Sequence, residues 1–455
     1  MQTMDVVIWT IRQRKGRAKP YELRWKVGTE PKSKSFLTKA LADHFRADLL
    51  KAAKKGEPFD TIIGLPASMT TTAEKASLSW YDFCRKYLRM RWKGAAAKTR
   101  ESIVDSLAVA TFALLTDEAS ELSKKEIRAA MQWALIPRQD DEAAPPHLDY
   151  AVRLLQKGTL NVSDLADPIV ARNVCEELTL TRDGKRAAAD TTARRRRGLN
   201  TALEYAIDLG ELAENPLKRV KQKKVARDNT VDRRCVVNPA QARELLVSLS
   251  YVGSWHRGRG RRLVAFFATL YFAGLRPAEA IGLRKTDCFL PEEGWGLLTL
   301  EVTRPSSGKQ WTDSGTVHDQ RGLKQRAERD VRPVPIPPEL VRILRTHLEE
   351  FGTAPDGRLF RNERGGVLGA STYSRAWEEG RRFALTPRQV ASPLAGKPYD
   401  LRHAALSTWL NAGVDATMVA ERAGNSVEVL LKRYAKCLDG RDSQINRRIE
   451  AALET

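Results

Sequence analysis

A basic, polar stretch that interrupts the chain is the feature that most constrains how this sequence can fold. It begins at Lys218-Arg-Val-Lys-Gln-Lys-Lys224 and continues to Arg234. A segment with so little apolar surface belongs to no core, so it divides one domain from the next. The chain has 455 residues, too many for one ordinary core, and we expect two or three domains of about 100–200 residues each.

A second linker, around Thr70-Thr-Thr72, lies near the start of the chain. Together the two linkers predict three domains, at residues 1–65, 73–230 and 235–455. The order of element types along the chain predicts a multidomain fold that is mainly α-helical with small β-sheets.

Residues 1–65 open with alternating β-branched and aromatic side chains, which are typical of strands. Three segments match this pattern and are joined by basic or Gly/Pro turns: Val6–Ile11, Tyr21–Val27 and Lys34–Leu37. A helix is expected from Thr38 to about Lys54, with Thr38 as its N-cap. The first domain should therefore be a three-stranded sheet with one helix.

The first domain is also strongly basic, with 14 Lys and Arg against 7 Asp and Glu. A sheet of this size fits one face into a DNA major groove, where basic residues of Arg12–Lys19 and Arg24–Lys34 would contact phosphates or bases. The alternative is a small solvated domain whose basic residues keep it soluble. Composition alone leaves both interpretations open.

Residues 73–230 show the helical spacing of apolar side chains. It is clearest in three segments, Leu78–Leu88, Thr99–Leu115 and Arg194–Leu209. The last segment carries four successive arginines, 194 to 197, which fan around the helix and cannot all face one partner. A charge run is usually a solvated face, but on a chain this basic it favours contact with phosphates.

Residues 235–455 mix helical and strand patterns, so we expect an α+β domain. Helical spacing begins at Asn238-Pro-Ala-Gln and returns from Leu263 to Ala273. The strand-like segments are Gly296–Val302 and Val331–Ile336.

The bulk composition narrows the class of partner. Lys and Arg total 77 against 56 Asp and Glu, a net charge of +21, and self-repulsion of that size points to a polyanionic partner. No apolar run approaches the ~20 residues of a membrane span and no N-terminal segment has a signal-peptide core, so we expect a cytosolic protein. Five scattered cysteines without Cys-x-x-Cys spacing predict neither a disulfide framework nor a zinc site.

Four short motifs follow one another in the last domain: Ala273-Gly-Leu-Arg276-Pro-Ala-Glu279, Tyr399-Asp-Leu-Arg-His403, Ala423-Gly-Asn-Ser426 and Leu430-Leu-Lys-Arg-Tyr434. Arg402 precedes Asn425 by 23 residues, and Asn425 precedes Tyr434 by 9. In this order and spacing the motifs resemble the two signature boxes of the tyrosine recombinase (phage integrase) family, most like integrases of actinobacterial mobile elements. The similarity runs over the whole last domain and more loosely over the rest.

The resemblance implies a role for each domain. Residues 1–65 would be an arm-type DNA-binding domain, residues 73–230 a helical core-binding domain, and residues 235–455 an α+β catalytic domain. Arg402–Val414 is similar to the helix–turn–helix that follows the second box, and Asn446–Leu453 would be a C-terminal helix that docks on a neighbouring protomer.

Cleavage of a phosphodiester by a tyrosine needs a nucleophile, neutralisation of charge at the phosphate, and a proton for the leaving sugar oxygen. A free phenol has a pKa of about 10, so at neutral pH it needs a nearby base or cation. The resemblance makes Tyr434 the nucleophile, and Arg276 and Arg402 the bidentate phosphate donors. It makes a hairpin lysine the general acid, here Lys324, with Lys309 as the second choice.

Two positions depart from the family pattern. Tyr399 stands where the second box usually opens with a histidine, and Asn425 stands where histidine or tryptophan is usual. Both can hydrogen-bond a phosphate oxygen, but neither is a good base near pH 7. His403 is then the expected proton acceptor, or alternatively a hydrogen-bonded core histidine. Glu279 either orients Arg276 or His403, or caps a helix.

The resemblance implies a site-specific DNA recombinase that integrates or excises a mobile element through a covalent 3′-phosphotyrosyl intermediate. No metal or nucleotide cofactor is expected, because the ester retains the energy of the broken bond. The expected partners are double-stranded DNA attachment sites, further copies of the chain in a homotetramer, and accessory DNA-bending or directionality factors in the bacterial nucleoid. Tyr399 and Asn425 keep open a cleavage-deficient DNA-binding protein of the same fold, and a monomeric type IB topoisomerase-like enzyme is a third reading.

Overall fold

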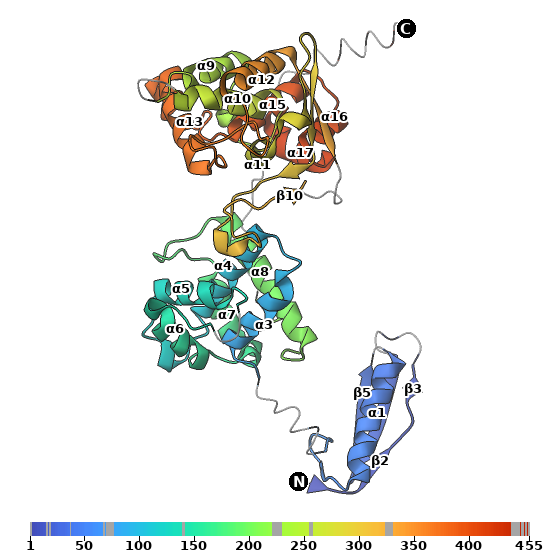
Figure 1. Cartoon of the computed structure of the whole chain (residues 1–455). Helices are drawn as coiled ribbons and strands as arrows, with labels where there is room; N and C mark the ends of the chain where they lie inside the picture. The colour runs from blue at the N-terminus through green and yellow to red at the C-terminus, as the bar shows by residue number, and fades with distance from the viewer. Residues whose placement is uncertain are drawn as a thin grey trace.

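The computed structural model describes residues 2–14, 17, 20–36, 38–66, 69, 77–138, 142–220, 230–253, 258–323, 331–437, 446, 450 and 453. These residues form helices and small antiparallel sheets in three groups that follow one another along the chain (Figure 1). We name them the N-terminal group (β1–β6 with α1), the helical group (α3–α8) and the C-terminal group (α9–α17). The predicted fold class, mainly helical with small sheets, is confirmed.

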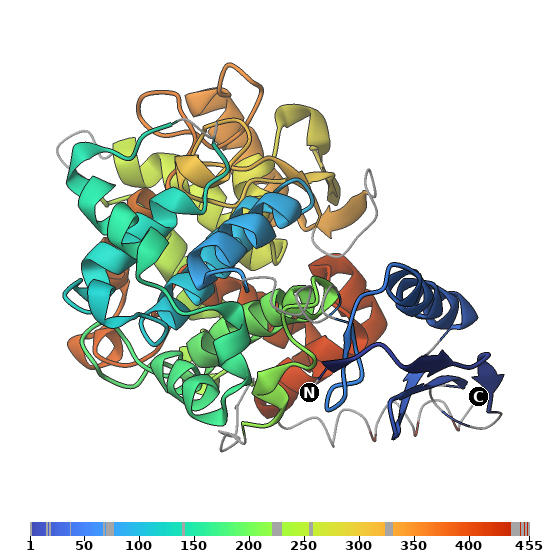
Figure 2. The same ribbon diagram turned by 90° about the horizontal axis from the view of Figure 1, so that it is seen from below.

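The N-terminal group is a small sheet with one helix on it. Its elements are β1 (Gln2–Thr3), β2 (Val6–Ile8), β3 (Arg12–Gln13), β4 (Tyr21–Val27), β5 (Glu30–Phe36), α1 (Lys39–Lys54) and β6 (Phe59–Asp60). Leu23, Trp25 and Val27 alternate along β4 and are buried on the side that α1 covers, as Figures 1 and 2 show. The opposite face of β4 carries Arg24 and Lys26, which remain accessible.

The first predicted strand is shorter than expected, and an additional strand, β3, gives the sheet four strands where three were predicted. β2 pairs with Trp25–Val27 and β3 with Tyr21–Glu22, both on the same edge of β4, while β5 pairs along the other edge. β5 begins at Glu30, earlier than predicted, because Gly28 with φ of 61° allows a tight turn directly after β4.

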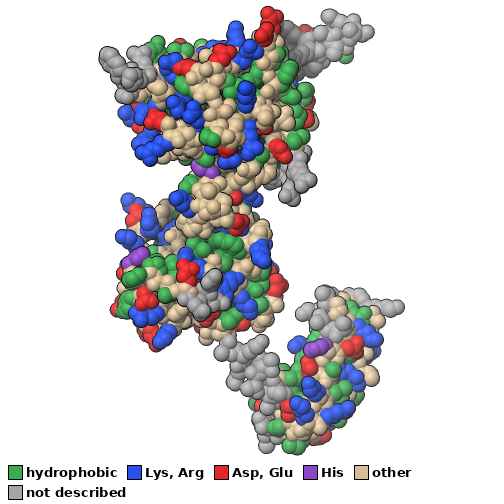
Figure 3. Space-filling view, in the orientation of Figure 1, with side chains coloured by type: hydrophobic (Ala, Val, Ile, Leu, Met, Phe, Trp, Pro, Cys, Tyr) green, Lys and Arg blue, Asp and Glu red, His purple; other side chains and the backbone are tan. Residues whose placement is uncertain are grey.

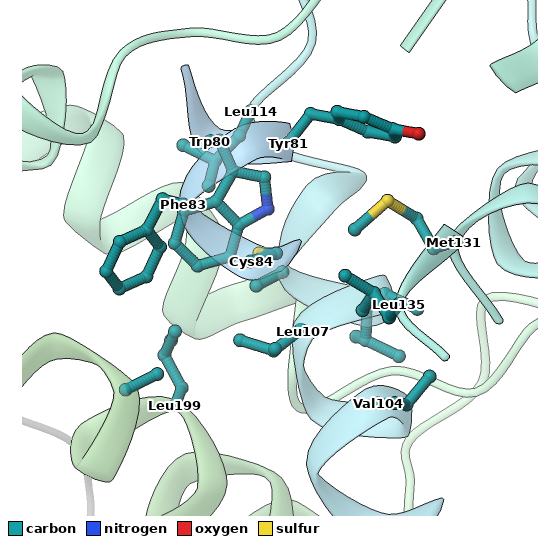
Figure 4. Close-up of a cluster of buried hydrophobic side chains, with 14 of the residues drawn as sticks. Trp80, Tyr81, Phe83, Cys84, Val104, Leu107, Leu114, Met131, Leu135 and Leu199 are labelled. Carbon is teal, nitrogen blue, oxygen red and sulfur yellow. The ribbon is translucent and has the colours of Figure 1, made fainter. Parts of the chain in front are cut away.

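The helical group is built around α4, which packs against four of the other helices. Its helices are α3 (Trp80–Trp92), α4 (Ala97–Thr111), α5 (Lys124–Ala134), α6 (Pro146–Lys157), α7 (Pro168–Glu177) and α8 (Ala189–Asp208). Figure 4 shows Trp80 and Phe83 of α3 packed with Leu107 of α4 and Leu199 of α8. The Trp80 indole N–H donates to Thr111 Oγ1 at 2.9 Å, so this polar group is satisfied inside the core.

The arginine run on α8 corrects one expectation. Arg195 is buried and donates to Asp105 and to the Leu180 carbonyl, and Arg196 donates to the Leu217 carbonyl. These two arginines stabilise the helical group from within and face no partner. Only Arg194 and Arg197 of the run are exposed, because consecutive residues on a helix point to different sides.

The C-terminal group surrounds the apolar helix α10. Its helices are α9 (Pro239–Leu249), α10 (Gly258–Phe272), α11 (Pro277–Gly282), α12 (Pro338–Phe351), α13 (Ala370–Ala384), α14 (Pro387–Val390), α15 (Asp400–Asn411), α16 (Ala416–Ala423) and α17 (Val427–Tyr434). Phe266 and Phe267 of α10 are fully buried and contact Phe360 and Trp377 with their rings. The helix predicted to begin at Asn238 is α9, and the Asn238 side chain caps it by accepting from the Gln241 N–H at 2.9 Å.

Two small sheets accompany these helices. One has the strand order β11 (Arg332–Ile336), β8 (Gly296–Leu300), β7 (Cys288–Phe289), and the other pairs β9 (Val302–Thr303) with β10 (Arg321–Gly322). The two predicted strands thus pair with each other, antiparallel, with Arg332 opposite Leu300. Short 3-10 turns complete the description, at Asp117–Ala119, Val162–Ala166, Pro216–Lys218, Arg233–Cys235, Lys285–Asp287, Lys309–Trp311 and Ala435–Cys437.

Residues 304–320, between β9 and β10, leave the C-terminal group and contact the helical group. We call this segment of the protein the arm, and it is distinct from the arm-type DNA sites mentioned above. Trp311 in the arm is 2% exposed and belongs to the apolar cluster of the helical group. Arg100 of α4 donates to the Trp311 carbonyl at 2.8 Å and to both carboxylate oxygens of Asp313 at 2.7 and 3.0 Å. The arm therefore joins the two groups through buried contacts.

Several predicted features fall on residues outside this description: Lys324, much of the linkers around Thr70–Thr72 and after Lys218, and most of Asn446–Leu453. Among the described residues, no helix combines the length and the apolar character that a membrane crossing requires.

Candidate active site

Six of the seven predicted site residues lie together in the C-terminal group. Arg276 immediately precedes α11, Tyr399 precedes α15, and Arg402 and His403 lie in its first turn. Asn425 lies in the turn between α16 and α17 and Tyr434 is the last residue of α17, as can be followed in Figure 1. The seventh, Lys324, is not among the described residues.

The two arginines of the motifs converge on one amide oxygen. Arg276 Nη2 donates to Asn425 Oδ1 at 2.8 Å, and Arg402 Nη2 approaches the same atom at 3.5 Å. Because an arginine only donates, this oxygen must face the two guanidinium groups, so the Nδ2 end of Asn425 is the end that can donate to a ligand. Two cations and an amide donor in such proximity suit an anion with several oxygens.

The turn around Gly424 holds both arginines by its backbone. The Gly424 carbonyl accepts from Arg276 Nη2 at 2.8 Å, and the Ala423 carbonyl accepts from Arg402 Nη2 at 2.7 Å. Arg402 Nη1 donates to the Gly274 carbonyl. Gly424 has φ of 62°, and a Cβ there would overlap Arg332 Nη1. Only glycine therefore allows the guanidinium groups to come this close.

Glu279 is buried and shared between two arginines. Its carboxylate accepts from Arg276 Nη1 at 2.7 Å and from Arg332 Nη1 and Nη2 at 3.1 and 2.8 Å. Burial opposes ionisation of the Glu279 carboxyl, but the charges and hydrogen bonds of Arg332 and Arg276 outweigh burial and lower its pKa to about 2. It also accepts from the Arg276 backbone N–H at 2.9 Å, so it both orients Arg276 and caps α11.

The sequence analysis missed Arg332. It lies on β11, where Arg332, Val334 and Ile336 are buried and alternate with more accessible residues. An arginine in register with two apolar core positions of a predicted strand is the signal that could have identified it.

Tyr434 and His403 form a hydrogen-bonded pair. Tyr434 Oη lies 2.8 Å from His403 Nδ1, and Tyr434 is 1% exposed. The His403 ring also meets the Tyr399 ring edge to face, with ring centres 5.0 Å apart. His403 is thus placed between the two tyrosines. This position is compatible with both interpretations of His403, a proton acceptor and a hydrogen-bonded core histidine.

Burial sets the protonation of this pair. It lowers the pKa of His403 to about 3, with help from the charges of Arg433 and Arg402, so the imidazole is neutral at pH 7. Burial also raises the pKa of Tyr434 well above its usual value, although Arg402 acts in the opposite direction. In the free protein the phenol therefore keeps its proton, next to a neutral imidazole that can accept one.

The two candidate lysines have different neighbours. Lys309 is exposed in the arm, two residues before Trp311, which is buried among helical-group side chains. Lys324 directly follows Leu323, which is buried in the core of the C-terminal group. The nearest described segments on either side of Lys324, β10 with Leu323 and β11, thus belong to the group that holds the site.

Comparison with known proteins gives relatives in sequence and in fold. No family model matches the sequence. The tyrosine recombinase XerC-like protein of Caldanaerobacter subterraneus subsp. tengcongensis is 23% identical over 247 residues, which are 50% of this chain and 57% of that protein. The match thus spans little more than half the length of that relative.

Solved structures of integrases have a similar fold. The integrase of the Tn1549 transposon, in complex with a circular intermediate DNA, matches with a TM-score of 0.50 at 16% identity, covering 83% of this chain and 100% of that one. The XerH site-specific recombinase bound to its difH substrate gives 0.47 at 13% identity, over 83% and 96%. In sequence this chain is thus similar to a tyrosine recombinase XerC-like protein, and its fold is similar to that of a transposon integrase.

Proposed function

We propose that the chain is a site-specific DNA recombinase that cleaves and rejoins DNA through a covalent 3′-phosphotyrosyl intermediate, and so integrates or excises a mobile element. The observation that carries the proposal is the meeting of Tyr434, His403, Arg276 and Arg402 at one place in a fold shared with a transposon integrase. A phenol, a neutral base and two guanidinium groups are what tyrosine attack on a phosphodiester requires.

In the proposed cleavage step, Tyr434 Oη attacks the phosphorus and its proton passes to His403 Nδ1. Arg276 and Arg402 exchange the backbone carbonyls that they now contact for the non-bridging phosphate oxygens, and Asn425 Nδ2 donates to the same phosphate. The bond to the 5′-oxygen of the next nucleotide breaks, and that oxygen takes a proton from the general acid. Attack by a 5′-hydroxyl on the phosphotyrosyl bond reverses these steps and rejoins the strand.

We assign the general acid to Lys324. The arm places Lys309 beside a tryptophan that packs into the helical group, whereas Lys324 adjoins a buried residue of the C-terminal group. Strand β11, which follows Lys324 in the chain, brings Arg332 to the Glu279 that orients Arg276. The link from β11 to the residue that orients Arg276 is what supports the assignment.

The three groups receive the roles that the resemblance implies. The N-terminal group reads arm-type sites with the sheet face opposite α1, which presents Arg24 and Lys26, and the helical and C-terminal groups hold the core site between them. Basic side chains appear on the visible surface of every group, as Figure 3 shows. On DNA the chain acts as a homotetramer, with accessory bending or directionality factors, in the bacterial nucleoid.

A cleavage-deficient DNA-binding protein of the same fold is the alternative that Tyr399 and Asn425 suggest. Asn425 bridges the two arginines and Tyr399 contacts the histidine beside Tyr434, so both replacements take part in the same arrangement. This participation supports cleavage over binding alone.

Covalent capture tests the proposal. Duplexes that the protein binds are selected from a randomised library and nicked one or a few bases from each candidate scissile phosphate, so that the freed strand diffuses away and cleavage cannot reverse. A protein–DNA adduct that survives denaturation supports the proposal. Specific binding at core sites without adduct at any nick position would favour the cleavage-deficient alternative.

A further inference from the structure

Arg332 occupies a position where an apolar side chain would be expected. It is 1% exposed on β11, in register with the apolar core residues Val334 and Ile336. Taking a guanidinium group out of water is costly, and a well-packed apolar residue in place of a buried ion pair is often no less stable. Fold stability alone therefore does not account for an arginine here.

The contacts of Arg332 are confined to the site. Both of its terminal nitrogens donate to Glu279, in the two-pronged geometry that fixes both partners. Its Nη1 also lies against Gly424, whose carbonyl accepts from Arg276. Arg332 thus contacts the carboxylate and the turn that together hold Arg276.

The charges explain why a third arginine is needed. Glu279 is the carboxylate that orients Arg276, but by itself it would cancel one of the two positive charges offered to a phosphate. With Arg332 present, three guanidinium groups and one carboxylate leave a net charge of three minus one, or +2. Without Arg332 the net charge is +1, and the freed carboxylate oxygens attract Arg276 more strongly.

We propose that Arg332 is a positioning residue of the cleavage site, which neutralises Glu279 so that Arg276 keeps both its orientation and its charge for the scissile phosphate. The inference rests on the proposed function. Arg332 is covered by protein and reaches the substrate only through Glu279 and Arg276. Loss of Arg332 should therefore slow the cleavage of a negatively charged phosphate more than the cleavage of a neutral one.

The test compares cleavage of an ordinary scissile phosphate with cleavage of a neutral methylphosphonate at the same position. The variants are Arg332→Met, Arg332→Lys and the pair Glu279→Gln with Arg332→Met. Arg358→Met is the matched control, because Arg358 is another buried arginine of the C-terminal group with a carboxylate partner, Asp356, and plays no part in the site. The rate of adduct formation in a single turnover is measured relative to the unsubstituted chain on each substrate.

Arg332→Met should cleave the ordinary phosphate about tenfold or more slowly at unchanged DNA affinity, and lose much less on the methylphosphonate. The cleavage rate of Arg332→Lys on the ordinary phosphate should lie between those of Arg332→Met and the unsubstituted chain. Lysine keeps the positive charge but lacks the two-pronged hydrogen-bonding geometry of arginine. The paired variant keeps two arginines and no carboxylate, which restores the net charge of +2. It should therefore cleave the ordinary phosphate faster than Arg332→Met alone. Arg358→Met should cleave both substrates like the unsubstituted chain.

Equal losses on both substrates, or a paired variant slower than Arg332→Met, would reduce Arg332 to a structural residue and overturn the inference. So would a rate for Arg332→Met equal to that of the unsubstituted chain. If Arg332→Met does not fold, the paired variant and Arg332→Lys carry the same comparison. A lack of adduct with the unsubstituted chain itself is a different result, because it removes the proposed function and this inference with it.

Discussion

Tyr399 and Asn425 depart from the pattern of the family that the chain resembles, yet both take part in the candidate site. Asn425 offers its oxygen to two arginines, and Tyr399 packs against His403. His403 is then the neutral base that lies within hydrogen-bond distance of Tyr434. The chemistry proposed for this site therefore depends on a histidine whose ring is buried.

The burial of His403 predicts a specific dependence of stability on pH. Its folded pKa of about 3 lies below the unfolded value of 6.5, so between these values the unfolded chain binds the proton and the folded chain does not. The stability that this contributes is fully present above pH 6.5 and is lost as pH falls towards 3, by at most about 1.4 kcal/mol per pH unit. His403→Asn removes this contribution.

Hydrogen exchange of the α10 amides, which reports unfolding of the C-terminal group, measures the effect from pH 6.5 to 4.5. The unsubstituted chain should lose protection more steeply than His403→Asn as pH falls. Parallel pH profiles would show that His403 titrates normally and is not buried as described.

At the scale of single elements, local patterns predicted several helices and strands but not others, such as α5, α6, α7, α12 and α13. Contacts between distant segments were not predicted. The helix that begins after Asn238, the apolar helix α10 and the strands β8 and β11 follow from rules of spacing and alternation. Arg332 was missed because its role lies in a contact with Glu279, 53 residues away in the chain. The same holds for the arginine run on α8, where burial of Arg195 depends on Asp105 of another helix.

The segment between β9 and β11 carries both candidate acids, and a change of leaving group separates them. Sulfur in place of the bridging 5′-oxygen leaves without a proton, so a lysine that acts as the acid becomes dispensable on that substrate. Lys324→Ala should be nearly inactive on normal DNA and cleave the sulfur substrate at close to the rate of the unsubstituted chain. Lys309→Ala serves as the comparison, and a rescue seen only with Lys309→Ala would exchange the two roles.

The arm should hold the helical and C-terminal groups together. Trp311→Ala removes a buried ring from the helical-group cluster and should cost about 3–5 kcal/mol of that contact. Limited proteolysis should then cut residues 304–320 many times faster, with helices of both groups still folded. Trp295→Ala, at an exposed tryptophan of the C-terminal group, is the control. Equal rates of proteolysis in both variants would mean that the arm does not hold the two groups together.

At the scale of the whole molecule, the N-terminal group and the group that holds the candidate site have separate apolar cores. The N-terminal group has an apolar cluster of its own, built from β4, α1 and Phe59. All the site residues that the structure describes lie in the C-terminal group, on α11, β11, α15 and α17 and in the turns that precede α11, α15 and α17. The domain boundaries proposed from the sequence rest on composition and linkers. The contact made by the arm could not be predicted, because nothing local marks Trp311 as a residue of another core.

A fragment of residues 73–455 tests the proposed division of roles between these groups. It should lose binding to arm-type sites and keep binding and cleavage at core sites, since Arg276, Arg402 and Tyr434 all remain. Binding to the two kinds of site is measured separately by gel shift. A fragment that binds no core DNA would place residues 1–65 in the core complex.

The most direct measurement of the central claim is the covalent adduct with nicked core-site DNA, compared between the unsubstituted chain and Tyr434→Phe. The substitution removes one hydroxyl and no charge, so both proteins should bind with the same affinity. The account predicts an adduct with the unsubstituted chain, mapped by mass spectrometry to the peptide that contains Tyr434, and none with the Phe variant. Undiminished adduct in Tyr434→Phe, or a nucleotide mapped to another residue such as Tyr399, would contradict it.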